Sequence, residues 1–522
     1  MTNVLELEAR RQRHQERLDA AKDQAARNRW GQFATPMPLA LEIARYAAAL
    51  WQKRSEPIRF LDPALGTGSF YSALRQVFTP ARIARAVGVE LDPRIVAAAA
   101  DLWKSTGIDV VAADFTHLPP PAPAEQFNLI LTNPPYVRHH HLERGDKERL
   151  QREVARQLDI KLSGLAGLYC HFLFLADAWL APGGLAVWLI PSEFMDVNYG
   201  QAVKRYVTER VKLLHVHRFS PLDVQFSDAL VSSAIVVFEK SSPAKRHAPL
   251  FTVGGTFLDP NRKQRVPLTT LQDAHKWTAF PLASTMATVI DDNPATLADL
   301  FVIKRGLATG ANDFFILPRE EADALEIPDE AVKPVLPSPR YLSEEIIETN
   351  TSGYPVNVPA LCLIDCELPE KAIREQYPTL WRYLERGKKQ DIDKGYLTSR
   401  RSPWYSQEQR PPAPFLCTYM GRPGNGRKPF RFIWNRSQAT ATNLYLVLYP
   451  KGTFARALKR QPALHEAVFR ELQAIDTETF LREGRVYGGG LYKMEPKELG
   501  RLPAAAVLRA AGVTLSRHAT LF

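Results

Sequence analysis

The motif with the clearest chemical meaning is Asn133-Pro134-Pro135-Tyr136, which follows directly after the apolar run at residues 127–132. Two consecutive prolines lack N–H donors and force an extended, rigid loop. The proline carbonyl oxygens and the side-chain oxygen of Asn133 can accept both hydrogens of one amino group. This favours a pyramidal nitrogen whose lone pair attacks an electrophile, while Tyr136 stacks on the ring that carries the amine. The alternative is a plain Pro-Pro turn after a buried strand.

A glycine-rich loop lies upstream, in the sequence LDPALGTGSF at residues 61–70. The loop closes a predicted strand and opens a helix, and Gly66 and Gly68 let the backbone pass close to a small ligand. No Gly-Lys-Ser/Thr follows, and the third glycine of the dinucleotide fingerprint is missing. These departures disfavour ATP and NAD as the ligand.

The next two predicted strands end at Glu90 and at Asp114-Phe115. A carboxylate at the carboxyl end of a strand can accept hydrogen bonds from both hydroxyls of a ribose. Asp114 can accept from an adenine amino group, and Phe115 offers an aromatic face to the adenine ring. Each feature alone also occurs in ordinary loops and caps. Their order on three successive strands resembles the layout with which methyltransferases hold S-adenosylmethionine.

The elements that must position these residues are short apolar runs, which alternate with helix-like stretches between residues 57 and 240. Such runs are typical of buried parallel strands joined by crossover helices. We therefore expect a doubly wound α/β domain with a Rossmann-like, mainly parallel, seven-stranded sheet. The runs span residues 58–66, 84–92, 109–115, 127–135, 184–192, 212–219 and 232–240.

Residues 30–240 resemble the gamma-class N6-adenine DNA methyltransferases of restriction-modification systems, with the motifs in that family's order. The resemblance implies that residues 31–36 close over the methionine end of S-adenosylmethionine and that Asp62 meets the methionine amino group. The catalytic residues that it implies are Asn133, Pro134, Pro135 and Tyr136, and the cofactor-binding residues are Phe33, Thr35, Asp62, Ala64, Gly66, Gly68, Glu90, Leu91, Asp114, Phe115 and Asn133.

Residues 226–238 resemble the family segment whose leading aromatic stacks on a flipped adenine. The resemblance makes Phe226 the partner of Tyr136 across the target base. A core phenylalanine at the start of a strand is the alternative. The base must leave the duplex because its amino group is otherwise engaged in pairing.

The strand and helix alternation breaks at residues 241–250, where we place a domain boundary. We expect an exposed N-terminal helical arm at residues 1–30 and a methyltransferase catalytic domain at residues 31–243. A mixed α+β target-recognition domain follows at residues 244–522, at the position where the resembled family carries one.

Positive charge is concentrated in the carboxyl-terminal half of the chain. The stretch of residues 386–436 contains twelve Lys and Arg against three Asp and Glu, and it carries most of the net charge of +11. Cations interleaved with aromatic residues suit contacts with double-stranded DNA. The alternative is that the cations form a solvated surface and the aromatic residues form a core beneath it. The candidate DNA-binding residues are Lys388, Lys389, Arg400, Arg401, Trp404, Arg427 and Arg431.

Composition excludes other classes of protein. With 522 residues, the chain is expected to bury at least two cores. No apolar run reaches the roughly 18 residues of a membrane span, and the polar start lacks the apolar region of a signal peptide. We expect a cytoplasmic monomer. Four cysteines without a second ligand pair disfavour disulfides and zinc, and His139-His140-His141 is interpreted as a polar loop, so no metal is expected.

Together these features predict an adenine-specific DNA methyltransferase that uses S-adenosylmethionine, with a separately encoded restriction endonuclease as a potential partner. Two alternatives stay open. The same catalytic loop occurs in methyltransferases that act on RNA adenine or protein glutamine, and a catalytically silent DNA-binding subunit is the second alternative.

Overall fold

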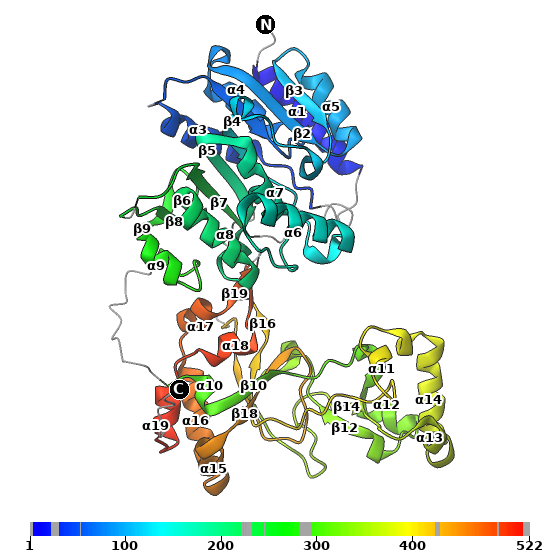
Figure 1. Ribbon diagram of the computed structural model, residues 1–522. Coiled ribbons are helices and arrows are strands. Elements are labelled where there is room, and N and C mark those ends of the chain that lie inside the picture. The colour runs from blue at the N-terminus through cyan, green and yellow to red at the C-terminus, as the bar shows by residue number, and fades with distance from the viewer. Residues whose placement is uncertain are drawn as a thin grey trace. The chain divides into compact units, whose positions relative to one another are not determined.

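The computed structural model describes residues 4–21, 31–52, 54–220, 223, 225, 232–244, 246–281, 295–422, 428–487 and 490–514. The chain forms two compact units (Figure 1). The first consists of Met1–Met286 with Val486–Gly490, and the second consists of Ala287–Arg485 with Leu491–Phe522. None of the described helices is long and apolar enough to cross a membrane.

A nine-stranded sheet forms the centre of the first unit, in the order β3-β2-β1-β4-β5-β7-β6-β8-β9. The first five strands of this order pair in parallel, and β7 is antiparallel to both of its neighbours. All seven predicted strands are present as β1 to β7, so the predicted Rossmann-like, mainly parallel sheet is confirmed. The strands are β1 (Ile58–Asp62), β2 (Ile83–Glu90), β3 (Ile108–Ala112), β4 (Phe127–Thr132), β5 (Leu180–Pro191), β6 (Lys212–Arg218), β7 (Ser233–Glu239), β8 (Leu250–Gly255) and β9 (Pro260–Arg265).

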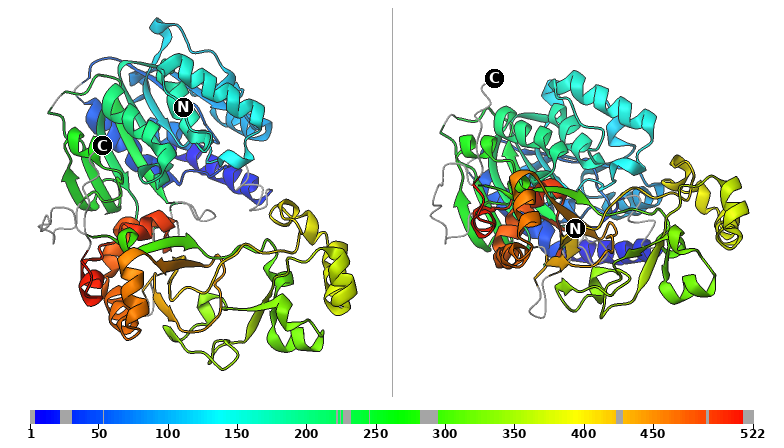
Figure 2. Two further views of the ribbon diagram at one scale, coloured as in Figure 1. Left: turned by 60° about the horizontal axis from the view of Figure 1, so that its bottom comes forward. Right: turned by 90° about the horizontal axis from the view of Figure 1, so that it is seen from below.

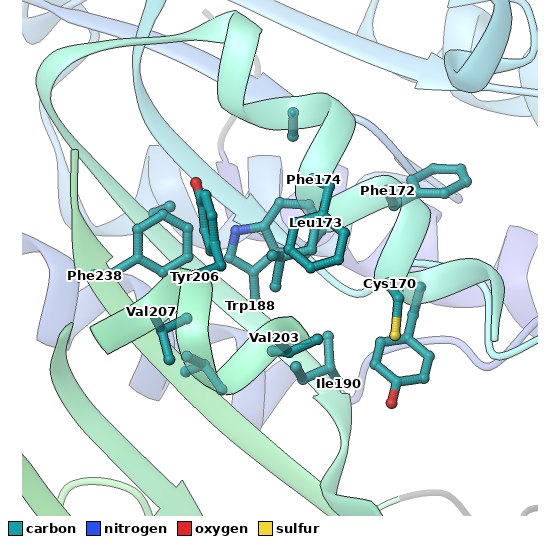
Figure 3. Close-up of a cluster of buried hydrophobic side chains, with 14 of the residues drawn as sticks. Cys170, Phe172, Leu173, Phe174, Trp188, Ile190, Val203, Tyr206, Val207 and Phe238 are labelled. Carbon is teal, nitrogen blue, oxygen red and sulfur yellow. The ribbon is translucent and has the colours of Figure 1, made fainter. Parts of the chain in front are cut away.

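Helices cover both faces of this sheet because successive strand residues point to opposite sides. Phe60 and Leu129 face a core with α1, α3, α4 and α5, whereas Leu61 and Ile130 face a core with α6 to α9. Figure 3 shows part of the second core, where side chains of α7 and α8 surround Trp188 of β5. The helices are α1 (Val4–Ala20), α3 (Met37–Trp51), α4 (Ser69–Val77), α5 (Pro93–Trp103), α6 (Arg144–Leu158), α7 (Leu168–Leu175), α8 (Gln201–Arg205) and α9 (Leu268–Asp273).

The N-terminal helix differs from the exposed arm that the sequence predicts. A helix is present as α1, but Leu7, Glu8 and Arg11 are buried on the side that faces α4 and α5. The sequence suggested exposure because two of these three buried residues are charged, and charged residues are rarely buried unless they are paired.

The first unit extends beyond the boundary predicted at residue 243. β8 pairs in parallel with β6, and β9 pairs antiparallel with β8, so residues 250–265 belong to the sheet of the first unit. β9 has the sequence PNRKQR and is a polar edge strand, which leaves no apolar run to mark it.

The second unit is a mixed α+β structure with several small sheets. The strands form sheets in the orders β10-β18-β15-β17-β13, β11-β14-β12 and β16-β20-β19, and in β19 only Arg485 is counted in the second unit. Their bounds are β10 (Phe301–Arg305), β11 (Ile316–Pro318), β12 (Val332–Val335), β13 (Ile346–Ile347), β14 (Leu361–Ile364), β15 (Phe415–Thr418), β16 (Met420–Gly421), β17 (Phe432–Asn435), β18 (Tyr445–Pro450), β19 (Arg485–Tyr487) and β20 (Leu491–Lys493).

The helices of the second unit gather at two separate places. α11 to α14 pack around the sheet of β11, β12 and β14, whereas α15, α16, α18 and α19 pack against the five-stranded sheet. The views of Figures 1 and 2 agree that these groups lie at opposite ends of the unit. The helices are α10 (Leu297–Leu300), α11 (Asn312–Phe315), α12 (Arg319–Ala324), α13 (Glu370–Gln376), α14 (Pro378–Lys389), α15 (Gly452–Arg460), α16 (Leu464–Ala474), α17 (Thr477–Glu483), α18 (Pro496–Gly500) and α19 (Ala505–Ala510).

Candidate active site

The predicted chemical groups of the first unit meet at one edge of the sheet. Asp62 and Glu90 are the last residues of β1 and β2, Asp114 follows β3, and Asn133 follows β4. These four strands are adjacent and parallel, so their carboxyl ends share one edge. This is where open α/β sheets bind their ligands.

The loop after β1 is open on one side and packed on the other. Gly66 and Gly68 have φ values of 56° and 91°, which favour glycine. A Cβ atom on Gly66 would meet no heavy atom of the described chain within 4 Å, whereas one on Gly68 would lie 2.5 Å from Nε1 of Trp103. A ligand can therefore approach the backbone from the Gly66 side.

Glu90 is fixed by backbone amides. Its Oε2 accepts from the Gly66 amide at 3.0 Å, and its Oε1 accepts from the amides of Leu91 and Asp92 at 2.9 and 2.8 Å. Burial raises the pKa of Glu90, although these hydrogen bonds act in the opposite direction. The carboxylate thus has a set orientation beside the open loop. The side chain of Leu91 is 60% exposed next to it.

Asp62 is a buried acid with one unpartnered oxygen. Its Oδ1 accepts from the Thr132 hydroxyl at 2.8 Å and from the Ala64 amide at 3.1 Å. Its Oδ2 is buried and has no hydrogen-bond partner among the described residues. Burial, with a smaller contribution from the charge of Glu90, raises the pKa of Asp62 to about 7. Oδ2 can therefore accept a hydrogen bond from one further strong donor, as a ligand ammonium would be.

Asp114 and Phe115 have more partners within the protein than the sequence suggests. Oδ1 of Asp114 accepts from the amide and hydroxyl of Thr116, each at 2.8 Å, and Oδ2 lies 3.1 Å from Nδ1 of His117. Phe115 is only 2% exposed, and its ring packs against Phe172 and Trp179. The predicted open face of Phe115 is therefore largely covered, because residues far along the chain complete this core.

Asn133 presents an unpaired acceptor. Its Nδ2 donates to the Phe33 carbonyl at 2.9 Å and lies 3.2 Å from Oγ1 of Thr35. A carbonyl can only accept, so the amide nitrogen must face Phe33 and the oxygen must face the other way. That Oδ1 is buried and has no partner among the described residues. A buried acceptor without a partner costs about 1–3 kcal/mol and suggests a functional role.

The backbone and hydroxyl of Tyr136 anchor the loop of residues 133–136. The Tyr136 amide donates to the Gly31 carbonyl at 3.0 Å, and its hydroxyl donates to the Leu189 carbonyl at 3.1 Å. The ring centroid lies 5.8 Å from that of Phe33, and the residue is 7% exposed. Residues 31–36 therefore contact the loop of residues 133–136. Phe226 lies outside the described residues.

In the second unit, three of the predicted DNA-binding residues contact backbone carbonyls or core side chains that are distant in the sequence. Arg401 donates to the carbonyls of Ala308 and Thr309 at 2.6 and 2.8 Å. Arg431 donates to the carbonyls of Pro339 and Leu342 at 2.8 and 3.1 Å. Trp404 is buried in a core with Phe314 and Phe315. The sequence predicts that these side chains are exposed and contact DNA. In the structure they instead form contacts within the second unit.

The other predicted basic residues are more accessible. Lys389 and Arg400 are exposed, and the Arg400 guanidinium lies 3.9 Å from the ring centroid of Tyr396, which is 75% exposed. Lys388 is half-buried and forms an ion pair with Glu370 at 2.6 Å. Arg427 lies outside the described residues.

The strand order, the open loop after β1 and the acidic residues beside it define the first unit as a Rossmann-like methyltransferase domain. Residues 97–224 match the family of Eco57I restriction-modification methylases. Residues 274–520 match the C-terminal domain of the Type II methyltransferase M.Eco57I. The chain belongs to the restriction-modification DNA methyltransferases.

Two curated relatives align with most of the chain. The Type II methyltransferase M.XamI of Xanthomonas campestris pv. amaranthicola is 29% identical over 484 residues, which are 91% of this chain and 85% of that protein. The Type II methyltransferase M.AccI of Acinetobacter calcoaceticus is 24% identical over 505 residues, with the same two coverages. The similarity thus includes both units.

Solved structures of restriction-modification enzymes share the fold. The Type IIL enzyme MmeI, solved in complex with DNA, has a TM-score of 0.58 at 11% identity, over 92% of this chain and 69% of that chain. The DrdV–DNA complex has a TM-score of 0.54 at 15% identity, over 95% of this chain. The chain spans 58% of DrdV, which is less than two thirds of its length.

Proposed function

We propose that the protein transfers a methyl group from S-adenosylmethionine to N6 of an adenine in a specific sequence of duplex DNA. The observation that carries the proposal is the arrangement of Asn133. Its amide hydrogens are occupied by Phe33 and Thr35, while its buried oxygen lacks a partner at the end of β4. An acceptor held in this way suits an incoming amino group.

The groups beside the loop after β1 fit S-adenosylmethionine. The open side of Gly66 admits a ligand to the backbone, the fixed Glu90 carboxylate suits two ribose hydroxyls, and the unpartnered Oδ2 of Asp62 suits an ammonium. Phe33, Thr35, Ala64, Gly68, Leu91, Asp114 and Phe115 complete the proposed cofactor-binding set. When bound, S-adenosylmethionine supplies an electrophilic methyl group on its sulfonium.

The catalytic loop acts on the acceptor amine. Asn133 Oδ1 and the Pro134 carbonyl accept the two amino hydrogens and stabilise the positive charge that develops on nitrogen during attack. Pro135 keeps the loop extended, and the anchored ring of Tyr136 holds the base in line. In the proposal, Phe226 stacks on the opposite face of the base.

The second unit supplies the contacts to DNA. A flipped base is required because N6 is engaged in pairing within the duplex. The exposed Lys389 and Arg400, with the half-buried Lys388, are the proposed phosphate contacts in the described chain, and Arg427 is a further candidate. The names of M.XamI and M.AccI, both Type II methyltransferases, support DNA modification, and a separate endonuclease is the expected counterpart.

The acceptor class is tested by incubating the purified full chain with S-adenosylmethionine labelled in its methyl group. Unmethylated genomic DNA, RNA and a protein extract are offered in separate reactions, and Asn133→Ala serves as the inactive control. We expect label in DNA alone, with turnover lowered at least 100-fold in Asn133→Ala. Label in RNA or protein, or equal turnover of the variant, would overturn the proposal.

A further inference from the structure

Helix α1 has a buried polar face. Glu8, Arg11 and Gln15 follow one another at spacings of three and four residues, which places them on one side of the helix. Glu8 is 6% exposed and Arg11 is 3% exposed. The sequence predicts a solvated helix here, so the burial of these charges requires an explanation.

The three side chains reach the cofactor loop and the helix that follows it. Nε and Nη2 of Arg11 donate to the two carboxylate oxygens of Glu8, both at 2.8 Å. Nη1 of Arg11 donates to Oγ1 of Thr67 at 2.9 Å. The Ser72 hydroxyl on α4 donates to Oε2 of Glu8 at 2.6 Å. An ion pair within α1 thus continues into the turn between Gly66 and Gly68.

Thr67 is fully engaged on the packed side of its loop. Its hydroxyl accepts from Arg11 and donates to Oε1 of Gln15 at 2.9 Å, while its carbonyl accepts from Nε1 of Trp103 at 2.9 Å. Thr67 is 3% exposed, and the neighbouring Gly66 faces open space. α1 and α5 therefore hold the turn from behind and leave its ligand side accessible.

We infer that α1 is a positioning element for the cofactor loop, in which Arg11 and Gln15 act through the Thr67 hydroxyl. A buried ion pair is a weak source of stability, since apolar residues of similar size pack as well. Here the ion pair of Glu8 and Arg11 leaves Nη1 of Arg11 to donate to Thr67. Thr67 lies in a turn between two glycines, which permit several backbone conformations. The inference rests on the proposed function, because it makes affinity for S-adenosylmethionine depend on this helix.

The test compares Thr67→Val, which removes the hydroxyl at nearly constant size, with Thr67→Ser, which keeps it. Arg13→Ala, an exposed cation on the same helix, is the matched control. The affinity for S-adenosylhomocysteine is measured by calorimetry below the melting temperature of every variant. Amide hydrogen exchange of residues 65–70 is measured on the ligand-free proteins.

We expect Thr67→Val to weaken S-adenosylhomocysteine binding about tenfold and to speed exchange of the loop, because the hydrogen bonds of the hydroxyl with the charged Arg11 and the neutral Gln15 are lost. At saturating S-adenosylmethionine, its kcat should stay within about twofold of the wild type, since the catalytic loop is untouched. Thr67→Ser and Arg13→Ala should resemble the wild type.

Unchanged affinity and exchange in Thr67→Val would overturn the inference. Absence of binding in the wild type, with faster exchange in Thr67→Val, would overturn the proposed function and leave the role of α1 in holding the loop.

Discussion

Single residues at the edge of the sheet combine burial with missing partners. Asp62 is buried, its pKa is raised to about 7, and its Oδ2 lacks a partner among the described residues. Asn133 shows the same pattern with a neutral amide oxygen. A buried oxygen without a hydrogen-bond partner lowers the stability of the free protein. In the proposed function, each of these two oxygens gains a partner when its ligand binds.

The titration of Asp62 gives a pH dependence with a definite sign. An ammonium beside Oδ2 favours the ionised acid, so binding of S-adenosylhomocysteine must remove the proton that the free protein keeps below pH 7. We predict that affinity rises about tenfold from pH 6 to pH 8, measured by calorimetry. The pKa of the neighbouring Glu90 is also raised by burial, so Asp62→Asn is the control. This variant should bind weakly without the pH dependence, and a wild-type affinity independent of pH would contradict the assignment.

Among the elements, the segment before α3 contacts the loop of residues 133–136, which we propose to be catalytic. Gly31 has a φ of 60°, and a Cβ atom there would lie 2.5 Å from the Tyr136 amide nitrogen. We predict that Gly31→Ala destabilises the first unit by about 1–3 kcal/mol and lowers turnover, because both the backbone conformation and the close approach are lost. Thermal unfolding measures the first effect. Gly145→Ala, where a Cβ has open space at the start of α6, should leave both properties unchanged. Equal melting temperatures for the two variants would contradict this role of Gly31.

The elements also show what sequence patterns can predict. β1 to β7 are apolar runs, and the order of Asp62, Glu90, Asp114 and Asn133 follows from parallel strands, so the sheet and its edge were predictable. β9 is polar, and α1 buries charges that look solvated, so neither signals its packing. Burial of Phe115 by Phe172 and Trp179 depends on contacts between distant parts of the chain, which periodicity does not contain.

In the molecule as a whole, a methyltransferase unit is joined to a second unit that contains the basic stretch at residues 386–436, within a chain of net charge +11. The sequence alone located the excess of positive charge in residues 386–436. It did not distinguish the exposed cations from those that form contacts within the second unit. Arg401 and Arg431 are half-buried and donate to the carbonyls of residues distant in the sequence. Lys389 and Arg400 are exposed, and Nη1 of Arg400 donates to the nearby Tyr396 carbonyl at 2.6 Å. The proposed DNA contacts are therefore drawn mainly from the exposed cations.

These exposed cations give a salt-dependent prediction for DNA binding. Replacing Lys389 and Arg400 by Ala should weaken binding to duplex DNA and reduce the slope of log K against log salt by about 2, because two phosphate contacts are lost. Fluorescence anisotropy at several salt concentrations measures the slope. S-adenosylhomocysteine affinity should not change. The double variant Lys459→Ala with Arg460→Ala, exposed on α15, is the matched control. An unchanged slope in the first variant would exclude the assigned contacts.

We propose that the unpaired oxygen of Asn133 receives the amino group of adenine. Mass spectrometry of nucleosides from duplex DNA, after reaction with the wild-type chain and S-adenosylmethionine, tests this role of Asn133. We predict N6-methyladenine as the modified nucleoside, within one recurrent sequence, and its loss in Asn133→Ala under conditions where that variant still binds S-adenosylhomocysteine. Methylated cytosine in place of methylated adenine, or N6-methyladenine formed undiminished by Asn133→Ala, would contradict it.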